Sequence, residues 1–257
     1  MQQPAVFDAP CYESNICAQQ YSVKFVMRTF AQAFLEWIDS LRFPEPIPHR
    51  VGVLNPYRDE RVRHVVRAFA QRYYADHRPR IGVFGINPGR FGAGVTGLMF
   101  TDPVALREDC AIPNDLGMRR ELSSTFVYRT IAAFGGPAVF YSQFYLSALS
   151  PLGFVQDGKN FNFYDDPELK EMALPFIVHS IHQQMSFPLR REVAIILGNG
   201  QLRTIAERLN AEHEFFDTLL FLEHPRFVAQ YRRKQLDYYV ERYVRTYHEA
   251  LSLCGER

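Results

Sequence analysis

The segment GINPGRFGAGVTGLMF, residues 85–100, holds residue types that could take part in chemistry. It follows an apolar run at 81–84 that is typical of a buried strand, and it offers Asn87, a glycine-rich loop and an aromatic ring, Phe100. An Asn-Pro pair alone indicates only a turn. Closely spaced glycines, however, let a backbone approach a ligand and point its N–H groups at it. Five glycines fall within thirteen residues here: Gly85, Gly89, Gly92, Gly94 and Gly97.

This loop lacks the signatures of two common phosphate-binding loops. A Walker-type loop would end in Gly-Lys-Ser or Gly-Lys-Thr, and residues 85–100 contain no lysine. The glycine spacing also differs from the dinucleotide fingerprint, and the sequence predicts no helix directly after the loop. A nucleotide-handling α/β enzyme that uses the glycine-rich loop for phosphate nevertheless stays an alternative interpretation.

The segment EHPRFVAQYRRK, residues 223–234, also follows an apolar run of strand length, at 219–222. It presents His224 before a basic stretch. Parallel strands of an open α/β sheet end at one edge, so we expect Asn87 and His224 to lie at the same edge. A neutral histidine can donate a hydrogen bond to a developing oxyanion, although a lone histidine at a strand end is often structural.

The basic stretch predicts contacts with a nucleic-acid backbone. We expect its cations at the start of a helix, where they oppose the macrodipole and are tolerated more readily if phosphates pass nearby. Aromatic rings between the cations suit stacking or wedging into DNA. A solvated helix start is the alternative. The stretch holds Arg226, Arg232, Arg233 and Lys234, with Phe227 and Tyr231 between them.

The composition indicates a globular chain. With 257 residues, of which 47% are hydrophobic, the chain is long enough for a sizeable core. The formal net charge of +1 excludes a polycation, so nucleic-acid affinity must come from local patches. No stretch has the pattern of a signal peptide or a membrane span, so we expect a soluble intracellular protein. The cysteines lack metal-ligand spacing and are expected to be free thiols: Cys11, Cys17, Cys110 and Cys254.

Strand and helix patterns alternate along the chain, which indicates βαβ units. We expect an α/β fold, a three-layer α/β/α sandwich around a short, largely parallel four-stranded sheet, with residues 1–20 as a loose arm and 21–257 as a single domain. The loop 101–118 lacks a period and is long, which is typical of a functional or mobile segment. Apolar runs of strand length lie at 81–86, 138–149, 193–198 and 218–223, with a short extended segment at 51–57. Helical periodicity covers 21–41, 58–75, 119–134, 167–185, 200–210 and 229–251.

The motifs together resemble those of the uracil-DNA glycosylase superfamily. The pattern is GxNPGxFG…TGxxF, then a strand ending in Ser-Pro-Leu with GKN after it, then His-Pro before a basic segment. It is most similar to the single-strand-selective monofunctional (SMUG) branch, and the likeness runs from 54–57 through the last predicted helix. The resemblance implies that superfamily's fold and a monofunctional DNA glycosylase, which hydrolyses the N-glycosidic bond of uracil in DNA and so initiates base excision repair.

The resemblance also implies roles for individual residues. Asn87 falls on the motif that positions the hydrolytic water, and His224 on the motif that steadies the leaving base. Phe100 falls on the aromatic residue that stacks under the flipped base, and Asn160 matches the GKN motif without a defined role. The base pocket is then expected from Ile86, Gly89, Phe91, Ala93, Phe100, Ser147, Ala148 and Ser150. The DNA-binding surface is expected from Arg90, Pro225, Arg226, Phe227, Tyr231, Arg232, Arg233 and Lys234.

Two departures from the SMUG pattern stand out. Arg226-Phe227 stand where that branch has Ser-Pro, and Ala148 stands where it has the asparagine that reads the pyrimidine. A methyl group cannot read a base edge, so we expect broader base recognition, including a deaminated purine such as xanthine. Ser147 and Ser150 are nearby hydroxyls that could replace the amide. The sequence is therefore closest to a diverged, bacterial-type SMUG-like subgroup.

We expect chemistry that uses no metal, no cofactor and no Schiff-base lysine. The expected partner is DNA, single- or double-stranded, with the damaged base flipped out of the stack and bound by a monomer. Such a protein would act in the cytoplasm of a bacterium or in the nucleus of a eukaryote. One alternative is a damaged-DNA-binding protein of this fold without turnover, which would bind abasic DNA and release no base. The other is a nucleotide-binding α/β enzyme, which would bind nucleotides in the absence of DNA.

Overall fold

The computed structural model describes residues 28–255. The arm predicted for 1–20 and the first residues of the helix predicted for 21–41 lie outside this range. The described part of that helix is α1 (Phe30–Ser40). Cys110 and Cys254 are free thiols, as expected. No helix within 28–255 combines the length and the apolar character that crossing a membrane requires.

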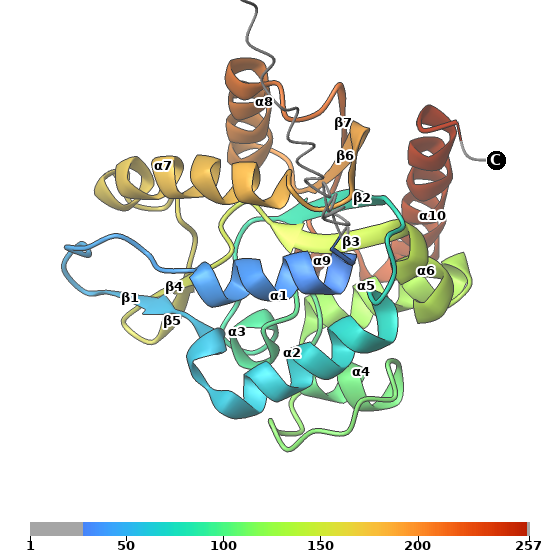
Figure 1. Ribbon diagram of the computed structural model, residues 1–257, viewed down its shortest axis with the longest axis horizontal. Coiled ribbons are helices and arrows are strands. Elements are labelled where there is room, and N and C mark those ends of the chain that lie inside the picture. Colours follow the sequence, from blue (N-terminus) through green and yellow to red (C-terminus); the bar gives the residue numbers. More distant parts are fainter. Residues whose placement is uncertain (1–27, 256–257) are drawn as a thin grey trace, which may run out of the picture.

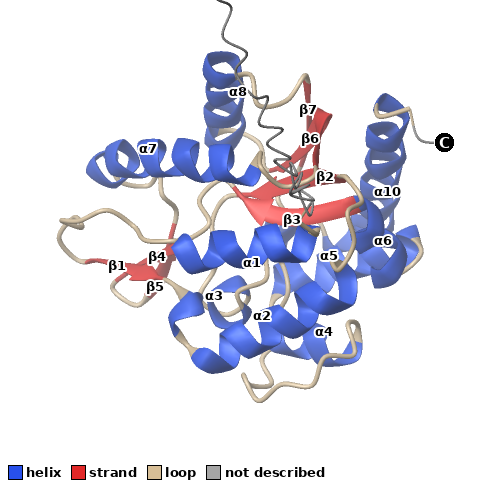
Figure 2. Cartoon of the chain, viewed as in Figure 1, coloured by secondary structure: helices blue, strands red, loops and turns tan. Residues whose placement is uncertain are grey.

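Four parallel strands form the central sheet (Figures 1 and 2). Val83 pairs with Leu146 on one side and with Ile195 on the other. All four strands therefore end at the same edge, and the predicted parallel sheet is confirmed. Their order is β3 (Phe144–Ala148), β2 (Arg80–Gly85), β6 (Leu189–Leu197) and β7 (Thr218–Leu222).

Helices cover both faces of this sheet, because successive side chains of a strand point to opposite faces. Val83 belongs to one buried apolar cluster and its neighbour Phe84 to another. The first cluster contains side chains of α1, α2 (Glu60–Tyr73), α5 (Leu122–Phe134), α6 (Pro137–Gln143) and α10 (Leu236–Leu253). The second contains side chains of α7 (Pro167–Gln184) and α8 (Gln201–His213), which lie across the sheet from α1 and α2 (Figure 1). This is the predicted three-layer sandwich.

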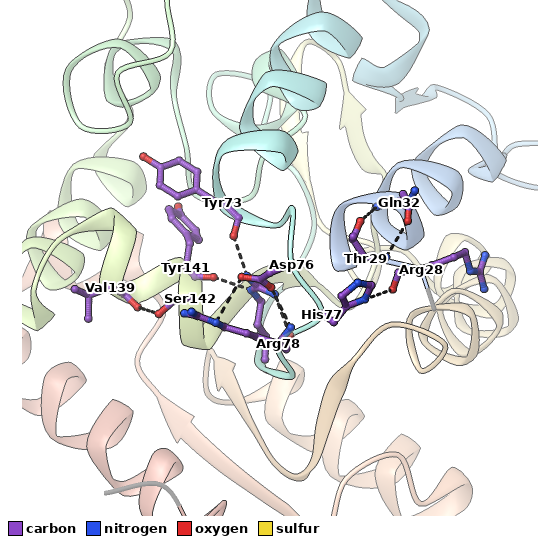
Figure 3. Close-up of polar contacts among 11 residues, drawn as sticks. Arg28, Thr29, Gln32, Tyr73, Asp76, His77, Arg78, Val139, Tyr141 and Ser142 are labelled. Atoms are coloured by element: carbon purple, nitrogen blue, oxygen red, sulfur yellow. Dashed lines mark hydrogen bonds and ion pairs between the residues drawn. The ribbon is translucent and has the colours of Figure 1, made fainter. Parts of the chain in front are cut away.

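The buried side chain of Arg80 anchors the start of β2, and its acceptors belong to Asp76, Tyr73 and Tyr141, which Figure 3 labels. Its Nε donates to the carbonyl of Tyr141 at 2.7 Å, and Nη2 donates to the carbonyl of Tyr73 at 2.8 Å. Its Nη1 donates to Asp76 Oδ1 at 3.0 Å. A buried charge is tolerated when it is paired and hydrogen-bonded in this way. The network fixes one end of β2, and the other end enters the glycine-rich loop.

A second, antiparallel sheet contains β1 (Val51–Leu54), β4 (Gly153–Gln156) and β5 (Lys159–Phe161), in that order. The sequence predicted an extended segment at 51–57. β1 confirms its first four residues, whereas the 3₁₀ helix η1 (Pro56–Arg58) begins near its end. The sequence did not predict the β4–β5 hairpin. Asp157 and Gly158 connect these two strands with positive φ angles of 47° and 71°. Such a pair is the preferred turn of a two-residue hairpin, so Asp-Gly was the missed signal.

Three predicted segments contain an unexpected helix, and one of them is the glycine-rich loop, which holds the short α3 (Ala93–Thr96). The strand predicted for 138–149 is wrong in its first half, because Pro137–Gln143 form α6, with proline at its first position, where a proline suits a helix. The loop 101–118 contains α4 (Pro103–Glu108). Asp102 caps α4 by accepting the backbone N–H groups of Val104 and Ala105, at 2.9 and 2.8 Å.

The helix predicted for 229–251 is divided into three elements. These are α9 (Pro225–Tyr231), the 3₁₀ helix η2 (Arg233–Gln235) and α10. All residues from Arg232 to Gln235 are exposed, so no packing holds them in one continuous helix. Arg232 is the C-cap residue of α9, where a cation agrees with the macrodipole. The expectation that these cations oppose a helix dipole is therefore wrong for Arg232.

Candidate active site

Asn87 and His224 line one cavity of about 740 Å³. Each residue stands two positions after its strand, β2 for Asn87 and β7 for His224, and both strands end at the same edge of the sheet. Phe100 lines the cavity with them. The other lining residues among those described are Ile86, Gly89, Arg90, Phe91, Ala93, Met99, Glu121, Ser123, Lys159, Asn160, Asn162, Arg226, Phe227, Gln230 and Tyr231.

The side chain of Asn87 is oriented by the chain that leaves β5. Its Nδ2 donates to the carbonyl of Phe161 at 3.2 Å, and its Oδ1 accepts the backbone N–H of Phe163 at 3.2 Å. One lone pair of Oδ1 remains for a further donor, since an amide oxygen accepts two hydrogen bonds. The amide is thus held in one orientation at the cavity wall.

The β4–β5 hairpin also holds the glycine-rich loop. Asn160 Oδ1 accepts the backbone N–H of Arg90 at 3.0 Å, and the Arg90 guanidinium donates to the carbonyl of Gly158. Gly153 lies so close to the loop that an added Cβ would stand 2.3 Å from the carbonyl oxygen of Pro88. The hydrogen bond to the Arg90 N–H gives Asn160 a structural role: it holds the glycine-rich loop just beyond Asn87.

Phe100 packs its ring against the end of β2. A Cβ on Gly85 would stand 2.6 Å from Phe100 Cζ, so only glycine admits the ring there. Phe100 has a φ of 55°, a conformation that non-glycine residues adopt infrequently and that surrounding structure must hold. Its ring centre lies 6.0 Å from that of His224. The Phe100 ring therefore presents a flat apolar face beside His224.

His224 is the N-cap residue of α9, and its ring has a defined tautomer. Nδ1 accepts the backbone N–H of Arg226 at 3.1 Å. A ring nitrogen that accepts carries no proton, so the proton of the neutral ring lies on Nε2. Burial, with a smaller contribution from the Arg226 charge, lowers the pKa of His224 to about 4. The ring is therefore neutral at pH 7 and can donate through Nε2.

Several residues of the cavity were missed by the sequence analysis. Glu121, the N-cap residue of α5, is the carboxylate among the described lining residues, and burial raises its pKa to about 7. Lys159 lies exposed at the rim, a lysine that the sequence alone did not place near the site. The Asp-Gly hairpin turn is the sequence signal that could have indicated Lys159, which directly follows it. The missed residues are Met99, Glu121, Ser123, Lys159, Asn162 and Gln230.

The structure does not bring Ser147, Ala148 or Ser150 to this cavity. Ser147 Oγ donates to Gln184 Oε1 at 2.9 Å, and Ser150 Oγ donates to the carbonyl of Leu152 at 2.7 Å. Ala148 is fully buried and pairs with Gly85 in the sheet. Two of the three residues, Ser147 and Ala148, line a separate cavity of about 20 Å³. These three residues therefore lie outside the cavity that Asn87, His224 and Phe100 share.

The predicted DNA-binding residues divide into two groups. Arg226, Phe227 and Tyr231 lie on α9 and line the cavity, and the rings of Phe227 and Tyr231 are exposed. Pro225 is buried at the first position of α9. Arg90 lines the cavity as well, with its guanidinium 4.3 Å from the ring centre of Phe91. Arg232, Arg233 and Lys234 are exposed beyond α9 and do not line the cavity.

Comparisons with known proteins agree with this geometry. Residues 71–247 match the model of the uracil DNA glycosylase superfamily. The crystal structure of wild-type SMUG2 from Pedobacter heparinus superposes with a TM-score of 0.84 at 36% sequence identity, over 88% of this chain and 99% of that chain. No curated protein matches the sequence significantly. The chain therefore belongs to the uracil DNA glycosylase superfamily, as a SMUG-like member, and is a uracil-DNA glycosylase.

Proposed function

We propose that this enzyme is a monofunctional glycosylase that releases uracil and at least one deaminated purine from DNA, leaves an abasic site and so initiates base excision repair. The observation that carries the proposal is the shared cavity of Asn87, His224 and Phe100, at the ends of β2 and β7. The catalytic unit is a single domain over 21–257 that acts as a monomer. Because its substrate is cellular DNA, it acts where the genome lies.

Asn87 positions the attacking water. Cleavage of an N-glycosidic bond develops positive charge at C1′ of the sugar, and a fixed amide oxygen can hold a water molecule below that carbon. The hydrogen bond from Asn87 to the Phe161 carbonyl and the one that Asn87 accepts from the Phe163 N–H keep the amide in place before substrate binds. This is catalysis by positioning, since an amide has no useful proton affinity.

His224 stabilises the leaving base. The base departs with the electron pair of the glycosidic bond, so negative charge develops on its carbonyl oxygen. The neutral ring donates from Nε2, because Nδ1 is occupied by the Arg226 N–H. A preorganised donor of this kind is typically worth about 3–4 kcal/mol in the transition state.

The base enters the cavity out of the DNA stack. An N-glycosidic bond inside a duplex is inaccessible to a protein side chain, so the nucleotide must flip out before the bond can be cleaved. The Phe100 face supports the flipped base, and Phe227 and Tyr231, exposed on α9, fill the gap that it leaves in the stack. Arg90 and Arg226 line the same cavity and hold the flanking phosphates.

The reaction stops at the abasic site. A lyase activity would need an amine that attacks C1′ to form a Schiff base, and the lysines that do so are desolvated in apolar pockets. Lys159 is exposed at the rim instead. It is suited to a phosphate contact.

One set of assays tests the proposal. The protein is incubated with oligonucleotides that carry uracil, xanthine, hypoxanthine or hydroxymethyluracil, single- and double-stranded, and abasic sites are then cleaved with alkali. Release of uracil and of one purine, without strand breaks before alkali and without borohydride trapping, is the expected result. Binding to abasic DNA without base release would support a damage-binding protein instead. Strand cleavage before alkali would replace the monofunctional assignment by a lyase that uses Lys159.

A further inference from the structure

Glu121 lies in the catalytic cavity without a role in the mechanism above. It is the N-cap residue of α5, and its backbone N–H donates to Asp102 Oδ2 at 2.8 Å, which ties it to the cap of α4. Its side chain lines the cavity with Asn87 and His224, and no other carboxylate does so among the described residues. The position is thus fixed by a backbone hydrogen bond, while the carboxyl group faces the reaction space.

The glycine-rich loop is shaped to admit this carboxyl group. A Cβ on Gly92 would stand 2.0 Å from Glu121 Oε2, and a Cβ on Gly89 would stand 3.2 Å from Oε1. Any other residue at 92 would displace the carboxylate or the loop. Gly92 also has an unusual backbone conformation, with φ −109° and ψ −106°, so the carboxyl group occupies a space that a glycine in this turn leaves open.

The hydrolysis releases one proton that neither Asn87 nor His224 can accept. As the water oxygen bonds to C1′ and the glycosidic bond breaks, the electron pair leaves with the base and the attacking water must lose a proton. Asn87 is an amide, already bonded to Phe161 and Phe163. His224 cannot accept it, because Nδ1 is occupied by the Arg226 N–H and Nε2 already carries a proton.

The surroundings of Glu121 suit a proton acceptor near neutral pH. Burial raises its pKa to about 7, with the Arg226 charge opposing the rise and the Asp102 charge adding to it. Arg90 and Lys159 line the same cavity as further cations. A general base works best when its pKa is close to the working pH. Bound phosphates would raise the pKa further.

We propose that Glu121 accepts the proton of the water that attacks C1′. The proposal rests on the glycosylase function set out above and requires that the water held by Asn87 reaches Glu121 directly or through a second water. One water O–H bond breaks as the O–C1′ bond forms, the proton moves to Oε1 or Oε2, and it leaves to solvent through the open cavity. Asn87 positions the nucleophile, Glu121 deprotonates it, and His224 stabilises the leaving base.

The test compares Glu121→Gln with the wild type in single-turnover release of uracil between pH 5 and 9. The wild-type rate should rise with pH through an apparent pKa near or above 7 and then level off. E121Q should be about 10²-fold slower on the plateau, the lower end for loss of a general base, and should lose the inflection. Its affinity for DNA with a non-hydrolysable uracil nucleotide should stay within about threefold, since the amide keeps the shape of the carboxyl group.

A matched control is Glu108→Gln, because Glu108 is an exposed carboxylate on α4, paired with Arg120 and outside the cavity. It should keep the wild-type rate and pH profile. Glu121→Ala provides a second readout. Formate at high concentration should restore part of its rate, which a purely structural role for Glu121 would not allow.

Three outcomes would overturn the assignment. The first is an E121Q rate and pH profile equal to wild type. The second is tighter DNA binding by E121Q with unchanged chemistry, which would make Glu121 a modulator of phosphate binding. The third is an E121A variant that formate does not rescue. If the Asn87 and His224 variants lose activity while E121Q keeps it, the glycosylase function stands and this inference alone fails. A wild-type protein that releases no base would contradict both the glycosylase function and this inference.

Discussion

The backbone N–H of Arg226 is hydrogen-bonded to Nδ1 of His224, at 3.1 Å, across the first turn of α9. This bond does two things at once. It caps the helix, and it leaves Nε2 as the protonated, donating nitrogen of a neutral ring. The structural and the chemical tasks of His224 are therefore separable by substitution.

We expect His224→Ala to slow base release by about 10²–10³-fold, because a preorganised donor to the leaving base is lost. His224→Asn keeps a side-chain oxygen that can cap α9 and serves as the matched variant. It should recover the stability of the wild type but not its rate. Because 5-fluorouracil is a better leaving group, His224→Ala should lose less activity on oligonucleotides with 5-fluorouracil than on those with uracil. An equal loss for every base in single-turnover assays would reassign His224 to a structural role.

The same histidine should make the fold sensitive to acid. Its pKa falls from 6.5 in the unfolded chain to about 4 in the fold, so the unfolded chain binds the proton more tightly. Acidification from pH 6.5 toward 4 therefore favours unfolding. Glu121 acts in the opposite direction over an overlapping range, since its pKa is raised from 4.5 to about 7 and its protonation favours the fold. Denaturant titrations at pH 7 and pH 5 should show a smaller acid-induced loss of stability in H224N than in the wild type.

Asn87→Ala should reduce release of uracil to below about 1% of wild type, because no group then holds the attacking water. The variant also loses the hydrogen bonds to Phe161 and Phe163. At about 1 kcal/mol each, they should lower the free energy of unfolding by about 2 kcal/mol. Binding to abasic DNA should be retained. Rates and thermal melting of the same preparation check both parts, and wild-type rates in N87A would remove Asn87 from the mechanism.

Arg232, Arg233 and Lys234 changed together to alanine should weaken DNA binding and flatten its dependence on salt. On duplex DNA the slope of log K against log salt should fall by about 0.9 for each phosphate that the variant no longer neutralises. The three side chains are exposed beyond α9, and the Arg232 guanidinium lies 5.0 Å from the ring centre of Phe227, a cavity residue.

Arg203 and Arg208 on α8 provide the control for that triple variant, since both are exposed cations outside the cavity and paired with glutamates. Their replacement by alanine should leave affinity and slope unchanged. Fluorescence anisotropy over a range of salt concentrations measures both. A triple variant with the wild-type slope would show that 232–234 is an ordinary solvated segment.

Met99 should influence which bases the enzyme releases. It lines both the catalytic cavity and the small cavity that contains Ala148. Met99→Ala should join the two spaces and raise the ratio of xanthine release to uracil release several-fold, because a purine needs more room than a pyrimidine. Met99→Leu, which nearly conserves volume, is the control and should keep the wild-type ratio. Competition assays with both oligonucleotides measure it.

Ala148→Asn, by contrast, should act mainly on stability. Ala148 is fully buried on β3, so an amide placed there without partners should cost about 1–3 kcal/mol. A clear shift toward uracil in A148N, with unchanged stability, would show instead that the amide reaches the base past Met99. Strict uracil selectivity in the wild type would contradict the expected purine release.

The local sequence was enough to predict the sheet and its active edge. The apolar runs that became β2, β6 and β7 are bounded by turns, and burial of such runs on both faces is what a parallel sheet requires. Asn87 and His224 each follow one of these strands, so their meeting at one edge follows from strand direction alone. The roles assigned to them came from the resemblance of short motifs.

Tertiary contacts decided the rest. The side chains of Ser147 and Ser150 are close to the active edge in sequence, yet their partners Gln184 and Leu152 turn them into the protein interior. Glu121 lies more than thirty residues from Asn87 in the chain, and its carboxyl group lies where a Cβ on Gly92 would stand 2.0 Å from Oε2. Sequence periodicity reports which face of an element is apolar; it does not report which distant backbone leaves room for a carboxylate. That depends on packing, which the folded chain alone determines.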